Sequence, residues 1–305
     1  MQQAMLWIGF VVLILGMLLL DILLLQKKKQ EIGIRESLLW TLIWILVSLA
    51  FNFAVYFYLG FDSALEFLTG YLIEKSLSVD NIFVFIIIFS YFDVPLKYQH
   101  KILFWGILGA VIMRAVFIFA GVAVIQQFHW VIYILGAFLV YIGIRMALQK
   151  NKDIRPEKNP VLRAFNRFFP VDTAYRGGKF FIKKAGKIAA TPLLVALIVI
   201  ETTDIVFAVD SIPAILSITL NPFIVFTSNM FAILGLRALF FTVSGIMRLF
   251  FYLNYGLSVI LVFVGIKMLI ADLYKIPVSI ALAAVGGILC ISIILSLLIP
   301  PKKQR

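Results

Sequence analysis

Apolar stretches long enough to cross a membrane recur along this chain, and they constrain its fold more than any other feature. A transmembrane helix needs about 20 predominantly apolar residues. Such segments fold as helices because a backbone in lipid must satisfy its own hydrogen bonds. The sequence therefore predicts an all-α, polytopic membrane helix bundle with about nine spans. The predicted spans are residues 4–25, 37–59, 64–90, 102–125, 130–148, 189–218, 223–246, 249–271 and 277–299.

The composition agrees with a chain whose main solvent is lipid. Hydrophobic residues make up 63% of the sequence and charged residues 14%, whereas a soluble domain carries roughly 25% charged residues. So few charges exclude a soluble enzyme, a disordered chain and a disulfide-rich secreted protein. The single cysteine, Cys290, excludes an internal disulfide and a cysteine metal cluster. No phosphate loop, nucleophile triad or zinc-protease motif occurs, so we expect no enzyme activity and no prosthetic group.

The basic residues predict the orientation of the spans. Connections on one side hold most lysines and arginines, above all residues 149–188, whereas those on the opposite side hold only Lys275. Because basic loops stay in the cytoplasm, we expect the N-terminus outside and the C-terminus in the cytoplasm. The net charge of +12 is then a topology signal that contacts anionic lipid head groups, and we expect no nucleic-acid partner.

Three short motifs recur in the same order and at nearly the same spacing. Several of the repeated motifs keep charged residues in register, which ordered chance matches would rarely do. The pairs are Val79–Ile82 with Val209–Ile212, Arg114–Phe117 with Arg237–Phe240, and Gly143–Met146 with Gly265–Met268.

These pairs predict an internal repeat within a single transmembrane domain, 1–305. Each repeat holds three spans, residues 64–148 and 189–271, and a basic cytoplasmic linker, 149–188, joins them. Because three is odd, the second copy enters the membrane from the opposite side. Such inverted repeats are common in secondary transporters, where the substrate lies near the midplane between the repeats.

Five acidic residues fall inside the third and sixth predicted spans. Ionisable groups at membrane depth are costly and mark functional sites by default. We expect Lys75, Arg114 and Arg237 to form structural ion pairs with them. Five acids against three bases leave two negative charges, which a divalent cation would neutralise. The acids are Glu74, Asp80, Glu201, Asp204 and Asp210.

The polar residues beside these acids are oxygen donors. Asn81 follows Asp80 and Ser211 follows Asp210, so each repeat offers an amide or a hydroxyl next to a carboxylate. Oxygen sites of this kind suit Mn²⁺, Mg²⁺ or Ca²⁺. The sequence therefore predicts a metal site built from the five acids together with Asn81 and Ser211. Further hydroxyls in these spans are those of Ser78, Thr202 and Thr203.

Helical spacing limits how these side chains can converge. In each repeat the upstream acid shares a helical face with the amide or hydroxyl two turns on, as Glu74 does with Asn81. The second acid, Asp80 or Asp210, lies roughly 120° away in an unbroken helix. Pro213 follows Asp210 and would free a backbone carbonyl nearby. We therefore expect interrupted helices at the core, whose free carbonyls add ligands.

Three long segments resemble the TerC family of integral membrane proteins and, within it, the Alx-like members. They are Phe67–Phe85 (FLTGYLIEKSLSVDNIFVF), Glu201–Leu216 (ETTDIVFAVDSIPAIL) and Ser228–Leu239 (SNMFAILGLRAL). The resemblance implies a bacterial inner-membrane protein of the wider LysE-type exporter group, with the five acids as the family's motif acids. It implies Mn²⁺ export for Alx-like members, tellurium resistance for the founding member, and an older label of redox modulator. Thr202-Thr203 departs from the Leu-Ser usual in the Alx pattern, which leaves the acids intact but slightly weakens the case for the hydroxyl ligands.

Residues and resemblance together predict a secondary transporter that exports a divalent cation, foremost Mn²⁺, with proton exchange as a candidate driving force. One alternative is a membrane redox or tellurium-resistance component, although redox chemistry needs a cofactor or a thiol pair. Another is a scaffold that docks stress-response proteins on residues 149–188, for which the acids would be dispensable. An amino-acid exporter, including one for lysine, is a further alternative.

Overall fold

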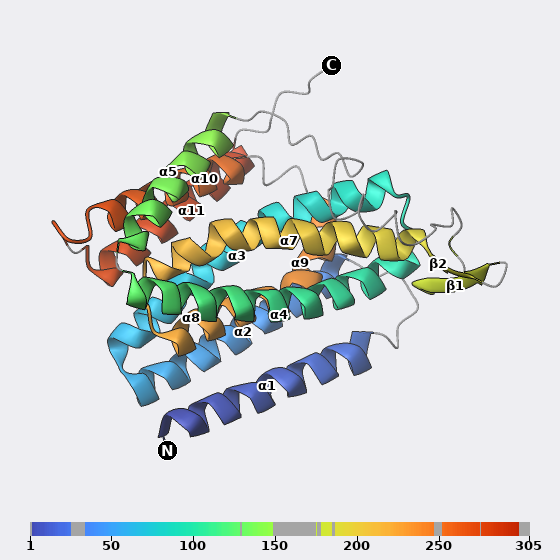
Figure 1. The fold of residues 1–305 in the computed structure, drawn as a ribbon, viewed down its shortest axis with the longest axis horizontal. Coiled ribbons are helices and arrows are strands. Elements are labelled where there is room, and N and C mark those ends of the chain that lie inside the picture. Colours follow the sequence, from blue (N-terminus) through green and yellow to red (C-terminus); the bar gives the residue numbers. More distant parts are fainter. Residues whose placement is uncertain are drawn as a thin grey trace.

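The computed structural model describes residues 2–25, 34–128, 130–148, 175, 178–184, 187–246, 252–274 and 276–298. Within these ranges the chain is helical apart from one short hairpin and the connecting turns, which confirms the predicted all-α, polytopic class (Figure 1). The elements are α1 (Gln2–Leu25), α2 (Ile34–Leu59), α3 (Phe61–Tyr91), α4 (Leu96–Gln127), α5 (Val131–Leu148), β1 (Phe181–Lys184), β2 (Lys187–Ala190), α7 (Pro192–Leu216), α8 (Pro222–Leu234), α9 (Leu236–Ile246), α10 (Leu253–Leu269) and α11 (Val278–Leu298).

Helix length and composition mark the membrane spans. Five of the described helices are long and apolar enough to cross a membrane, or six if the bent pair of α8 and α9 is one span. Of the remaining helices, α10 is shorter, α3 carries several charged residues, and α1 contributes the apolar stretch Leu6–Met17. Each predicted apolar stretch coincides with a helix, and 223–246 coincides with two. The count of nine spans stays a prediction.

Large apolar side chains cover the outside of the bundle. On α2, Leu46 is 55% exposed and Phe53 63% exposed, and Ile294 on α11 is 52% exposed. A soluble monomer rarely exposes apolar surface so continuously. In a membrane protein these side chains contact lipid tails, so the apolar outside of the bundle needs no protein to cover it.

The helix interruption lies elsewhere than the sequence predicted. Both α3 and α7 run unbroken past their acids, so the interruptions expected in 64–90 and 189–218 are wrong. The helix α7 continues through Pro213 because a proline in the last turn removes only one intrahelical hydrogen bond. The break falls instead at Gly235, between α8 and α9, whose axes differ by 42°.

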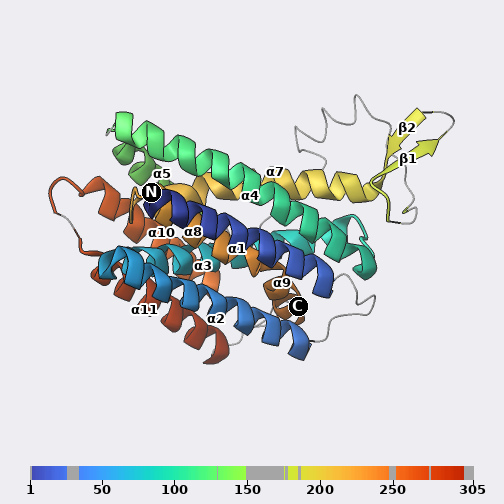
Figure 2. The ribbon, with the colours of Figure 1, turned by 90° about the horizontal axis from the view of Figure 1, so that it is seen from below.

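A β-hairpin precedes α7 where the sequence predicted the start of a span. The strands β1 and β2 are antiparallel, with Phe181 opposite Ala190, so the helix begins at Pro192 rather than at residue 189. The Thr191 hydroxyl donates to the Lys179 carbonyl at 2.7 Å and closes the base of the hairpin. Figure 2 shows the hairpin projecting beyond the ends of α4 and α7. Most of the predicted linker, 149–174, lies outside the described residues.

The helices α5 and α10 pack with their backbones in close contact, beside α11 (Figure 1). A Cβ at Gly136 would lie 3.0 Å from the Gly265 carbonyl oxygen, and one at Gly143 would lie 2.8 Å from the Ser258 carbonyl oxygen. Matching Gly143 to Gly265, as the repeated motif does, also matches Gly136 to Ser258, so the repeat exchanges the two contacts. An antiparallel pair of this kind is what two inverted repeats would produce, although the repeat itself stays a prediction.

Candidate functional site

A buried arginine lies at the centre of the helix bundle. Arg114 on α4 is 1% exposed, and its guanidinium group donates to the Glu74 carboxylate on α3. It also donates to the Asp204 carboxylate on α7, from Nη2 to Oδ1 at 3.4 Å and from Nε to Oδ2 at 3.5 Å. Glu74 is 0% exposed and Asp204 4% exposed. One cation therefore bridges an acid from each predicted repeat.

Two uncharged side chains complete this Arg114 cluster. Nη1 of Arg114 donates to Asn229 Oδ1 at 3.3 Å and to Ser211 Oγ at 3.4 Å. The Asn229 amide donates in turn to Glu74 Oε2 at 3.2 Å. Because Nη1 has two protons and three acceptors, the contacts to Asn229 and Ser211 are the weaker, shared ones. The cluster thus joins four helices, α3, α4, α7 and α8, through side chains that are all buried.

The Arg114 cluster carries one net negative charge, from two carboxylates and one guanidinium. Removing two charges of opposite sign from water is costly, and the pair is kept only when its hydrogen bonds are satisfied. Here both carboxylates accept from Arg114, and Glu74 also accepts from Asn229. The arrangement can hold a cation among four oxygen-bearing side chains from three helices, and in this structure the cation is the guanidinium.

The remaining predicted ligands lie around the Arg114 cluster rather than in it. Glu201 is half-buried on α7, with its carboxylate packed against Gly109 of α4. Asn81 is 2% exposed on α3. The helices α3 and α7 also include Asp80 and Asp210, whose side chains lie outside the described part of the structure.

The candidate hydroxyls other than Ser211 bond to their own helices. Thr202 and Thr203 donate to carbonyls one turn earlier in α7, each at 2.6 Å. Ser78 donates to the Lys75 carbonyl at 2.7 Å. These bonds satisfy the hydroxyl protons and leave a weaker case for the three side chains as ligands.

The other two predicted bases lie apart from Arg114. Lys75 is half-buried and donates from Nζ to the Ala232 carbonyl of α8 at 3.3 Å. Arg237 is buried in α9, just after the helix break. Pairing of either base with an acid stays a prediction.

Asn229 is the cluster residue that the sequence reasoning did not single out. It lies in the quoted segment Ser228–Leu239, where an amide inside a run of apolar residues was an available signal. Its role depends on α8 packing against α3, which hydropathy does not report.

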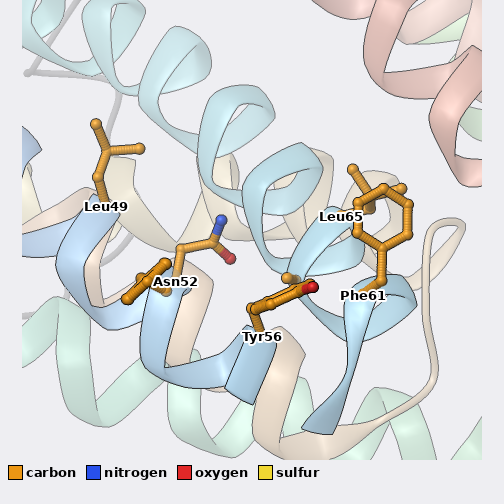
Figure 3. A pocket seen from close by; sticks show the side chains of 7 residues that line it. Leu49, Asn52, Tyr56, Phe61 and Leu65 are labelled. Carbon is orange, nitrogen blue, oxygen red and sulfur yellow. The ribbon is translucent and has the colours of Figure 1, made fainter. Parts of the chain in front are cut away.

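Two further observations limit what the geometry supports. Among the described residues, no three histidine, cysteine, aspartate or glutamate side chains lie close enough together to hold a metal ion. A pocket of about 320 Å³ opens between α2 and α3, where Asn52 and Tyr56 face Phe61 and Leu65 (Figure 3). Its lining is mainly apolar and includes no member of the Arg114 cluster, so it is not the ion site.

Known proteins resemble this chain along most of its length. The model of the integral membrane protein TerC family matches residues 59–304. A candidate membrane-bound redox modulator, Alx, of Escherichia coli K12 is 45% identical over 300 residues, which cover 95% of this chain and 94% of that protein. An uncharacterized membrane protein of Myxococcus xanthus is 48% identical over 293 residues, covering 96% and 92%. No solved structure matches.

Proposed function

This chain belongs to the TerC family of integral membrane proteins, and we propose that it is a secondary transporter that exports a divalent cation, with Mn²⁺ as its cargo. The observation that carries the proposal is the Arg114 cluster, in which Glu74 and Asp204 from separate halves of the chain share one buried cation. Acids at this depth are expensive and are retained for ion or proton transfer.

The cluster suits a hard cation by its donor chemistry. The carboxylates of Glu74 and Asp204, the Asn229 amide oxygen and the Ser211 hydroxyl are oxygen donors. Mn²⁺ prefers such ligands and keeps water in its remaining coordination positions. Asp80, Asp210, Asn81 and Glu201 are proposed to add ligands as the cation moves.

Arg114 competes with the cargo in this proposal. A divalent cation can bind Glu74 and Asp204 only if the guanidinium group releases at least one of them, since both now accept from Arg114. In the empty protein, Arg114 prevents two buried carboxylates from facing each other uncompensated. Cation binding and the release of Arg114 would then be coupled, which gives the two halves a reason to change their relative position.

Protons are the proposed counter-ion. A carboxylate must lose its proton to bind a metal, so metal and protons compete for the same oxygens. The proposal places the chain in the bacterial inner membrane, with the N-terminus outside and the C-terminus cytoplasmic. Protons that enter from outside would then replace Mn²⁺ on the acids, so an inward proton gradient would drive the export of Mn²⁺.

The relatives' name suggests a rival, a membrane redox component. The chain has one cysteine, Cys290, which is exposed on α11, so an internal dithiol couple is impossible. The rival gives no reason for Glu74 and Asp204 to share a buried cation. A scaffold role would likewise leave the acids dispensable, and the same experiment separates all three.

The test is Mn²⁺ uptake into inverted membrane vesicles at several pH values. Glu74→Gln and Asp204→Asn keep side-chain size but remove the charge that a hard cation needs, so each should lower uptake by about tenfold or more, since even changes to the partners of metal ligands cost roughly 10–100-fold in affinity. Cys290→Ser is the matched control, and it should transport like the unmodified protein. Full uptake by both acid variants, at equal amounts of inserted protein, would refute the exporter proposal.

A further inference from the structure

The helix break at Gly235 leaves backbone carbonyls without helical donors. The last carbonyls of a helix lack intrahelical partners, and α8 ends at Leu234 in the interior of the bundle, where its final turn is buried. In an unbroken helix the Ala232 carbonyl would accept from the backbone four residues on. Inside a membrane protein no bulk water can pair with a freed carbonyl, so another donor is needed at this point.

Lys75 supplies that donor from α3. Its ammonium group lies 3.3 Å from the Ala232 carbonyl oxygen. Glycine at position 235 makes the approach possible, because a Cβ there would lie 2.7 Å from Lys75 Nζ and 3.2 Å from Trp44 Cβ. The lysine, the break and the glycine therefore form one unit, which we call the Lys75 cap.

A helix end of this kind attracts cations. The C-terminus of a helix carries a partial negative charge of about half an electron, and the carbonyl ends of broken helices in transporters coordinate transported cations. Here the position is filled by a cation that is tethered to the chain. The Lys75 cap is thus separate from the Arg114 cluster, although Lys75 is adjacent in sequence to Glu74.

The two contacts together align α8 with α3. Glu74 accepts from Asn229, and Lys75 donates to Ala232, one helical turn further along α8. A change in the Lys75 cap would therefore shift Asn229 relative to Glu74 and alter the Arg114 cluster.

We propose that Lys75 is a fixed internal cation that occupies the carbonyl end of α8, excludes soluble cations from it, and positions Asn229 on Glu74. Lys75 is a positioning residue and does not bind the cargo. The consequence for transport rests on the proposed export function, whereas the structural role does not.

The experiment removes the charge and then returns it in soluble form. Lys75→Ala should lower the thermal stability of the purified protein in detergent, because a buried carbonyl loses its donor, and should lower Mn²⁺ uptake, because Asn229 shifts relative to Glu74. Butylammonium should restore both properties, because it places an ammonium group at the same carbonyl. Butanol of similar size should restore neither. Lys183→Ala on the exposed face of β1 is the control and should change neither property.

A second variant tests the glycine. Gly235→Ala should displace the ammonium group and reproduce the losses of stability and uptake expected for Lys75→Ala. Gly286→Ala on α11, where a Cβ meets open space, is the control and should change neither property. Rescue by butanol as well as by butylammonium would overturn the proposal, since it would show that only packing was lost. Wild-type behaviour of Lys75→Ala would also overturn it. If the unmodified protein does not transport Mn²⁺, the export proposal fails, and the stability rescue still decides the role of Lys75.

Discussion

Replacing Arg114 with methionine should damage the fold more than replacing any other charged residue of the Arg114 cluster. The guanidinium group is the charge partner of both Glu74 and Asp204, and each of these acids is almost fully buried. Breaking a buried ion pair by removing one partner costs about 3–5 kcal/mol, because the other charge is left uncompensated. Two carboxylates share Arg114, so the loss should reach the upper end of that range unless one of them takes up a proton.

The same reasoning predicts that the damage can be reversed without restoring any charge. Glu74→Gln and Asp204→Asn, added to Arg114→Met, remove both stranded carboxylates and leave neutral side chains, and the amide at position 74 can still accept from Asn229. Replacing a whole buried ion pair with well-packed apolar residues of similar volume is often neutral in stability, and here uncharged residues of similar size replace all three charged ones. The triple variant should therefore be close to the unmodified protein in stability, although it should not transport.

Thermal unfolding of purified protein in detergent, with the yield of membrane-inserted protein, measures both effects. The coupling energy from a mutant cycle over the single and combined variants reports the interaction directly. Equal stability of Arg114→Met and the unmodified protein would refute the argument that the acids need this cation. A triple variant as unstable as Arg114→Met would show instead that packing, rather than charge, holds the site.

Three further predictions concern other parts of the chain. Asp80→Asn and Asp210→Asn should each abolish Mn²⁺ resistance of cells while leaving the inserted protein folded, and normal survival under excess Mn²⁺ would remove both from the proposed ligand set. In a cysteine-free background, cysteine at position 62 should react with an impermeant maleimide from outside, and cysteine at position 152 only after permeabilisation; external labelling at 152 would contradict the orientation. Gly143→Ala should cost about 1–3 kcal/mol by pressing on the Ser258 carbonyl, and an unfolding temperature equal to that of a Gly→Ala variant in open space on α11 would argue against this close contact.

The membrane class and the helix positions could be predicted from the sequence because hydropathy and length are properties of one segment at a time. Each apolar stretch became a helix whatever its neighbours were, since a backbone in lipid has no alternative partner. The sequence also predicted that Glu74, Arg114 and Asp204 lie within the membrane-spanning stretches, because a charged residue inside an apolar run can be recognised without knowing its contacts. The proline pattern was misleading at Pro213, because it predicted an interrupted helix, whereas α7 continues through this residue in its last turn.

Only the tertiary structure decided which groups meet. Arg114 reaches Glu74 and Asp204 because α4 packs against α7 and α8, which both pack against α3, and helix rotation is set by contacts between segments far apart in the chain. Asn229 joined the site for the same reason. The break at Gly235 needed a donor from another helix, and Lys75 provides it. The carbonyls freed by this break take a partner from another helix, and the sequence of the segment alone does not show that such a partner is in reach.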